Sequence, residues 1–234
     1  MANVAGEYGV DQAKNGLGLE VQKFVERFMI SPEQAEETVA SFARRYRKNH
    51  AKDGVVSDDP LTVADRLTIS KAIVSRYAIY SAALGAGTAA PGMFPGVGTA
   101  VVAGGAVTDL GVSIKLQCDM TLCLVTLYRE SLSRDDQIQL AMVMALAGSA
   151  QQFAAGAGKE FAEKAAAKLV YQYLKGPTLQ FIKMLFKKVA INFTQKAAAK
   201  VIPFGIGVGV SAAANYATTR VVGRVSRLVL TGPA

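Results

Sequence analysis

Residues 77–108 read YAIYSAALGAGTAAPGMFPGVGTAVVAGGAVT, a run of 32 residues without a charge. Pro91-Gly92 and Pro95-Gly96 interrupt the run near its middle, which predicts a turn between two apolar helical arms. A soluble domain buries such a run as two helices packed against each other, whereas a bilayer receives it as a short hairpin. In either case the run provides hydrophobic contact and no reaction chemistry.

The length of the two arms bears on which of these surroundings applies. Each arm, about 77–90 and 97–108, is shorter than the roughly 20 residues that a membrane-spanning helix needs. Its glycines and alanines let helix backbones approach closely, which serves packing in lipid and in a soluble core alike. We favour the soluble core, because the other segments of the chain each keep a polar face; insertion into lipid stays the alternative.

Helical periodicity continues on both sides of this hairpin, and no strand-like alternation of useful length interrupts it. Ser31, Pro32 and Gln34 form a helix start with a capping residue, and Gly176-Pro177 ends one helix before the next. We therefore predict an all-α fold, a compact multi-helix bundle with a central Gly/Ala-rich apolar helical hairpin. The predicted helices cover residues 19–29, 32–49, 62–77, 97–129, 135–155, 159–175, 178–200 and 201–230.

Charge divides the chain at a linker that contains Gly54 and Asp58-Asp59-Pro60. Residues 1–60 hold 8 basic and 10 acidic side chains (net −2), whereas residues 61–234 hold 18 basic and 8 acidic ones (net +10). This division predicts an N-terminal helical extension over 1–60, whose first 18 residues are mobile, and a helical domain over 61–234. The extension is a candidate regulatory or partner-binding piece.

The positive charge is concentrated near the end of the chain, because eleven basic residues and no acidic one follow Glu163. Such a field favours an anionic partner, either phospholipid headgroups or nucleic acid. Nucleic-acid binding also needs a base-stacking or base-reading element, and we find none. The segment 178–200 instead reads as a basic amphipathic helix. Its predicted apolar stripe consists of Leu179, Ile182, Leu185, Phe186, Val189 and Phe193. Its predicted contacts with a membrane surface are Lys183, Lys187 and Lys188.

The residues that usually carry catalysis or bind metals are sparse. Cys118 and Cys123 lie five residues apart, a spacing that suits free thiols better than a disulfide, and His50 is the only histidine, too few ligands for zinc. The glycine-rich segments GAGTAAPG and GIGVGV lack the Lys-Ser or Lys-Thr pair of a phosphate loop. We therefore predict no catalytic residue, no metal and no cofactor, and a protein that is not an enzyme.

Asp109 is the first charge after the uncharged run. A buried carboxylate is costly unless it is paired. One interpretation is structural, in which Asp109 pairs with a late arginine or accepts a hydrogen bond from Asn215 or Thr219; the other makes it the polar anchor of a ligand pocket between the two apolar elements. Asp119 lies ten residues further, about 15 Å along a helix, too far to act with Asp109 as acid and base.

The segment 71–230 resembles the EcsC protein family. The resemblance rests on the turn AAPGMFPGVGTA leading to Thr108-Asp109, on the following helix with Gln117 and Tyr128, and on the late Ile202-Pro203-Phe204-Gly205 with Asn215 and Arg220 beyond it. It implies an all-helical, bacterial, membrane-associated protein and transfers no catalytic residue. Asp109, Asn215 and Arg220 are carried over as family features, with a structural or ligand-pocket role.

These observations predict a non-enzymatic, membrane-associated or lipid-binding protein that binds an anionic membrane surface or a hydrophobic ligand, with a membrane-protein partner as a further option. The first residues carry acids and glycines where a signal peptide has a basic start and an apolar core, so we expect a cytoplasmic protein, peripheral to the inner membrane. The alternatives are a membrane-inserting or pore-forming protein and, with less support, an enzyme that acts on a lipid-like substrate.

Overall fold

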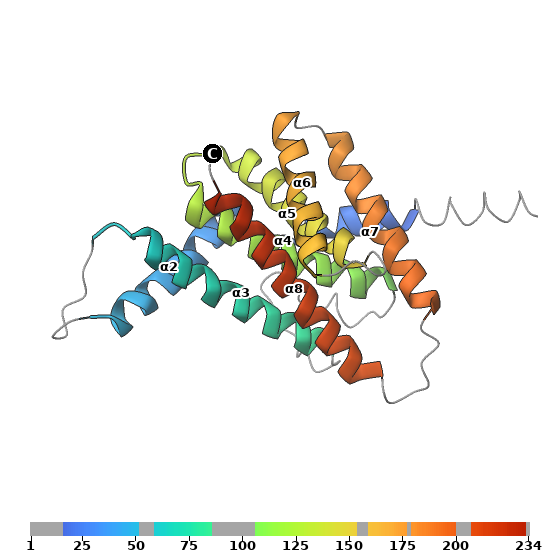
Figure 1. Cartoon of the computed structure of the whole chain (residues 1–234), viewed down its shortest axis with the longest axis horizontal. Coiled ribbons are helices and arrows are strands. Elements are labelled where there is room, and N and C mark those ends of the chain that lie inside the picture. Colours follow the sequence, from blue (N-terminus) through green and yellow to red (C-terminus); the bar gives the residue numbers. More distant parts are fainter. Residues whose placement is uncertain are drawn as a thin grey trace, which may run out of the picture.

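The structure is a computed structural model, and it describes residues 16–51, 59–85, 106–153, 159–176, 179–199 and 207–232. Within these ranges every element is a helix, and the helices pack into one bundle (Figure 1). The predicted all-α fold is confirmed. A helix over residues 16–28 is followed by α2 (Pro32–Asn49), α3 (Val63–Gly85), α4 (Ala106–Tyr128), α5 (Arg134–Phe153), α6 (Lys159–Lys175), α7 (Leu179–Ala199) and α8 (Gly207–Thr231).

A local sequence signal explains where α2 begins. The Ser31 hydroxyl accepts a hydrogen bond from the Gln34 backbone N–H at 3.3 Å, and the Gln34 side chain accepts one from the Ser31 N–H at 2.9 Å, so α2 begins with the predicted capping box. The first helix is described from residue 16, three residues before its predicted start. The predicted turn of the apolar hairpin and the first 15 residues lie outside the described residues.

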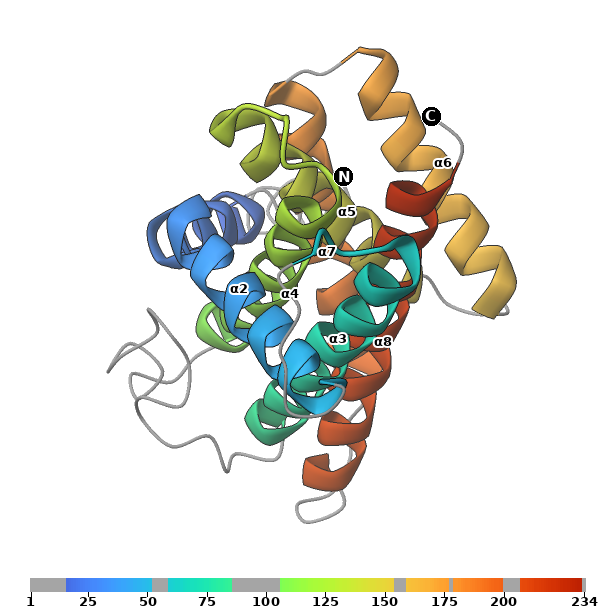
Figure 2. The ribbon, with the colours of Figure 1, turned by 90° about the vertical axis from the view of Figure 1, so that its left-hand side faces the viewer.

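Helix α4 occupies the centre of the bundle, where it contacts α2, α3, α5 and α8 (Figure 2). Every side chain from Leu110 to Leu127 is buried, including the polar and charged ones. A helix that is enclosed on all sides needs no polar face, which explains its apolar composition. The described part of the second hairpin arm, at the start of α4, therefore leads directly into the core.

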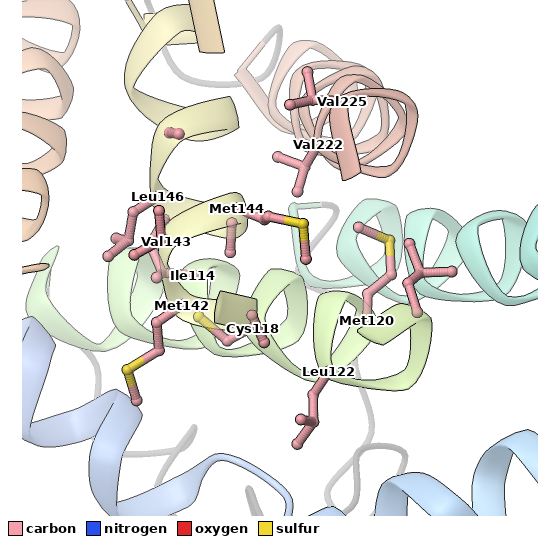
Figure 3. Packing of buried hydrophobic residues seen from close by; sticks show 14 of the residues in the cluster. Ile114, Cys118, Met120, Leu122, Met142, Val143, Met144, Leu146, Val222 and Val225 are labelled. Atoms are coloured by element: carbon pink, nitrogen blue, oxygen red, sulfur yellow. The ribbon is translucent and has the colours of Figure 1, made fainter. Parts of the chain in front are cut away.

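Side chains from α4, α5 and α8 interdigitate to form much of this core, with methionines filling the space between branched residues (Figure 3). Two glycines permit the closest helix approaches. A Cβ at Gly148 of α5 would lie 2.8 Å from a methyl group of Val222, and one at Gly223 of α8 would lie 2.5 Å from a methyl group of Val74. At both positions a larger residue would force the helices apart.

Helices α3 and α8 lie side by side in both views (Figures 1 and 2). Their contacts join Val74 to Gly223 and the Ser81 hydroxyl to the Thr219 hydroxyl, which donates to it at 2.9 Å. Residue numbers rise along α3 as they fall along α8, so the two helices are antiparallel. The first apolar arm of the predicted hairpin, as far as it is described, is thus packed against α8 and α4.

Residues 16–50, part of the predicted N-terminal extension, contact the rest of the bundle. Val21 and Val25 are buried in the common core, and a Cβ at Gly111 of α4 would lie 2.9 Å from the Phe24 ring. The Ile30 backbone N–H donates a hydrogen bond to Asp119 of α4 at 3.0 Å. The division at residue 60 stays a prediction; these contacts make the first helices part of one packing unit with α4.

In the described part of the chain one segment, Leu110–Tyr128, is long and apolar enough to cross a membrane. Its apolar window is entirely buried inside the molecule. A core helix of a soluble protein has the same length and composition, so this segment is weak support for a membrane span.

Candidate functional site

Helix α7 carries the three lysines that the sequence singles out for contact with a membrane. Lys183, Lys187 and Lys188 are all exposed. The opposite side of the helix is buried in the core, so the three lysines face solvent over about two turns. The buried residues on that opposite side are Ile182, Leu185, Phe186 and Val189.

Apolar side chains accompany these lysines on the exposed side of α7. Leu179, which the sequence pattern assigns to the buried stripe, is 59% exposed, and Met184 is about half exposed. Leu179 departs from the pattern and is the first residue of α7. The exposed face of α7 therefore mixes positive charge with apolar groups, as helices that bind membrane surfaces do.

Helix α6 presents a second basic stripe. Lys164, Lys168, Tyr171 and Lys175 are exposed and follow one another at intervals of four, three and four residues, which places them on one side of the helix. Near the connection to α7, Leu174 is about half exposed. The end of α6 and the start of α7 lie close together, since the Tyr173 and Phe181 rings are 5.9 Å apart (Figure 1). We call Lys164–Lys188 as a whole, α6 with the start of α7, the basic hairpin.

The three residues predicted as polar anchors lie on two helices. Asp109 is in the first turn of α4, but its side chain is outside the part of the structure that is described. Asn215 and Arg220 are both on α8 and partly buried, and their spacing of five residues turns them about 140° apart around the helix. Thr219, a predicted hydrogen-bond partner of Asp109, donates instead to Ser81.

Arg220 belongs to a stripe of arginines that the sequence analysis did not recognise as a group. Arg220, Arg224 and Arg227 follow at intervals of four and three residues on one side of α8. Arg224 forms an ion pair with Glu163 at 2.8 Å. Partial burial, together with the two neighbouring arginines, lowers the pKa of Arg227. Arg220 and Arg227 add positive charge next to the basic hairpin, because α6 and α8 are in contact.

The largest departure from the sequence analysis is an ion pair inside α4. Lys115 Nζ lies 2.6 Å from Asp119 Oδ2, and the two side chains are 0% and 1% exposed. Asp119 Oδ1 also accepts the hydrogen bond from the Ile30 N–H. Burial raises the pKa of Asp119 to about 6, although Lys115 and the Ile30 N–H act in the opposite direction. Asp119 is therefore a buried carboxylate, whereas the side chain of Asp109 lies outside the described part of the structure.

A second polar group on α4 consists of Gln117 and Thr121, each two residues from Asp119 in the sequence. The Ser149 hydroxyl of α5 donates to Gln117 Oε1, and the Thr121 hydroxyl donates to the Ala141 carbonyl at 2.8 Å. These bonds join the two central helices through side chains that would be costly to bury alone. Because they are enclosed within the core, they hold α4 and α5 together and are not open to a ligand.

The thiols are also enclosed and unreactive. Cys118 and Cys123 are free and fully buried, as the sequence predicts for free thiols. Burial raises the pKa of Cys123 to about 12 and that of Cys118 well above its usual value. A thiol that stays protonated is a poor nucleophile. Among the described residues no group of three side chains is placed to hold a metal ion.

No protein-family model matches the chain, and neither a curated protein nor a solved structure was found to be similar to it. The resemblance to the EcsC family stays a prediction that rests on the short motifs quoted above. The function is therefore inferred from the sequence and the structure of this chain. Its chemistry is that of a surface with exposed cations and apolar groups over a closed core.

Proposed function

We propose that this protein is a non-enzymatic, peripheral membrane-binding protein of the bacterial cytoplasmic side, which attaches to anionic lipid through the basic hairpin. The observation that carries the proposal is the exposed face of α7, where Lys183, Lys187 and Lys188 lie beside Leu179 and Met184. Cations near an anionic surface contribute about 1 kcal/mol each, and the apolar side chains add retention.

The charge balance of this region supports the proposal. Glu163, the last acidic residue of the sequence, is already paired with Arg224, so the lysines that follow it have no carboxylate further along the chain to neutralise them. The sequence after Glu163 is therefore of one sign, which favours approach to a negative surface. The cytoplasmic location and the absence of catalysis belong to the same proposal.

Flotation with liposomes tests it. Purified protein is mixed with vesicles of neutral phosphatidylcholine alone or with phosphatidylserine added, at low and high salt. The expected result is flotation with anionic vesicles that high salt abolishes. Replacing Lys183, Lys187 and Lys188 by glutamine should weaken binding about a hundredfold, since roughly 3 kcal/mol is removed.

A matched control separates local from overall charge. Arg44, Lys48 and Lys71 are exposed cations on α2 and α3, and replacing them by glutamine changes the net charge by the same amount. That variant should still float. The proposal is contradicted if both variants lose liposome binding equally, or if flotation depends on neither lipid charge nor salt. Release of an enclosed dye would instead favour the pore-forming alternative, because peripheral binding leaves vesicles intact.

A further inference from the structure

The described structure contains an open groove between α2 and α3, with a volume of about 710 Å³. This size is within the range of sites for small molecules. It is distinct from the basic hairpin, because its described lining residues belong to α2, to the C-cap residue His50 and to α3. Asn215 and Arg220, both on α8, are not among the lining residues.

The walls of the groove are apolar over most of their length. Phe42 and Tyr46 come from α2, and Ile69, Ile79 and Tyr80 come from α3. The α3 residues that line it extend from Thr68 to Tyr80, about 18 Å along a helix at 1.5 Å per residue. Ile79 is 58% exposed, an unusual exposure for a large aliphatic side chain in the middle of a packed helix. An elongated apolar ligand would cover it.

The described side chains that line the groove include basic ones and no acidic one. Arg45 and Arg76 line it together with His50, and no acidic residue of the described part of the chain does. The Arg76 guanidinium carbon lies 5.8 Å from the ring centroids of both Phe42 and Tyr80, which fixes its position through cation–π contacts. A guanidinium held in this way is preorganised for a bidentate contact with a carboxylate or phosphate.

Asp65, whose hydrogen-bond partner Tyr46 lines the groove, is engaged by other donors. Asp65 accepts hydrogen bonds from the Tyr46 hydroxyl at 2.6 Å and from the Thr62 N–H at 2.9 Å. These bonds keep the pKa of Asp65 below its usual value, so it stays ionised and engaged outside the groove lining. Among the described lining residues, the positive charge of Arg45 and Arg76 therefore has no negative counterpart.

We propose that the groove between α2 and α3 binds a single-chain amphiphilic anion, with the aliphatic chain against Ile69 and Ile79 and a carboxylate or phosphate head at Arg76 and Arg45. This site is independent of membrane attachment through the basic hairpin. It uses different helices and recognises single amphiphile molecules, not a surface.

Calorimetric titration of the full-length protein tests the proposal with dodecanoate and dodecyl phosphate, both below the concentrations at which they form micelles. Either or both should bind, and their relative affinities show which head group the arginines prefer. Dodecanol and inorganic phosphate, which carry only the chain or only the charge, should bind at least tenfold more weakly. Equal binding of dodecanol would overturn the proposal.

Two variants locate the site. Arg76→Met keeps a long apolar side chain and removes the charge, and it should weaken binding of the charged probes about tenfold to a hundredfold. Lys71→Met is the matched control, an exposed cation on the same helix that does not line the groove, and it should bind like the wild type. Unchanged affinity in Arg76→Met would contradict the assignment.

A fluorescent reporter gives an independent readout, because the sequence contains no tryptophan. Ile79→Trp introduces one at an exposed position of the groove, and its emission should shift to the blue when dodecanoate is added. Leu228→Trp, at a position that is 51% exposed on α8, should not shift. Replacement of Lys183, Lys187 and Lys188 by glutamine should leave the blue shift intact, so a failure here is separable from a failure of membrane binding.

Discussion

At the scale of single residues, Lys115 and Asp119 place two opposite charges in the middle of the most enclosed helix. Removing one member of a buried pair leaves the other without compensation and typically costs about 3–5 kcal/mol. We expect Lys115→Met to lower the free energy of unfolding by this amount, measured by urea denaturation.

A second substitution serves as the control for that prediction. In the double variant Lys115→Met/Asp119→Asn no charge remains, and the asparagine side chain keeps an acceptor for the Ile30 N–H. The double variant should therefore be more stable than Lys115→Met alone. If it is less stable, burial of an unpaired carboxylate is not the source of the loss.

Asp119 also predicts how stability depends on pH. Its pKa is about 6 in the folded protein, against an ordinary value of 3.8. Between these values the folded protein holds a proton that the unfolded chain has released, so the contribution is full below about pH 4 and is lost as the pH rises through 6. Relative to the double variant Lys115→Met/Asp119→Asn, in which neither group titrates, the wild type should lose up to about 3 kcal/mol between pH 4 and pH 7, at about 1.4 kcal/mol per pKa unit. Parallel stability curves for the two proteins would contradict this assignment.

At the scale of elements, the antiparallel contact of α3 with α8 depends on Gly223. A Cβ there would lie 2.5 Å from a methyl group of Val74, so Gly223→Ala should cost about 1–3 kcal/mol through overpacking. Val74→Ala removes the obstructing methyl groups. Thermal unfolding of the double variant should show a loss smaller than the sum of the two single losses. Strict additivity would mean that the two residues do not obstruct each other.

Elements with local signals were predictable from the sequence, and contacts between distant elements were not. The capping box at Ser31 and the break at Gly176-Pro177 set the boundaries of α2 and α6 through neighbouring residues alone. Lys115 and Asp119, in contrast, have the four-residue spacing of an ordinary surface pair, and only the surrounding helices bury them. The groove was missed because its two walls come from opposite sides of the predicted domain boundary.

The candidate membrane surface was partly visible in the sequence. The pattern of α7 identified Lys183, Lys187 and Lys188, which are exposed, and four residues of its apolar stripe, which are buried. It assigned Leu179 to the buried side, because a periodic pattern does not show which residues of an apolar stripe the neighbouring helices cover. The exposed apolar residues beside the lysines therefore required the tertiary structure.

At the scale of the whole molecule, the first helices and the later ones share one core. The helix over 16–28 covers α4, and Gly18 packs against the backbone of Lys187 in α7, where a Cβ would lie 3.1 Å from its Cα. We expect a fragment covering residues 61–234 to unfold at a clearly lower temperature than the full chain and without a sharp transition in calorimetry. A fragment that unfolds cooperatively at the temperature of the full chain would instead support an independent domain.

The hydrogen bond from Ile30 to Asp119 joins residues that are 89 positions apart. A ribosome adds about 5–20 residues per second, so the first helix emerges roughly 4 to 18 s before the part of α4 that completes its packing. During that interval Val21 and Val25 have no native surface to cover them. The early chain therefore exposes an apolar stripe while it is still being synthesised, and this stripe is where a chaperone that acts on nascent chains would bind.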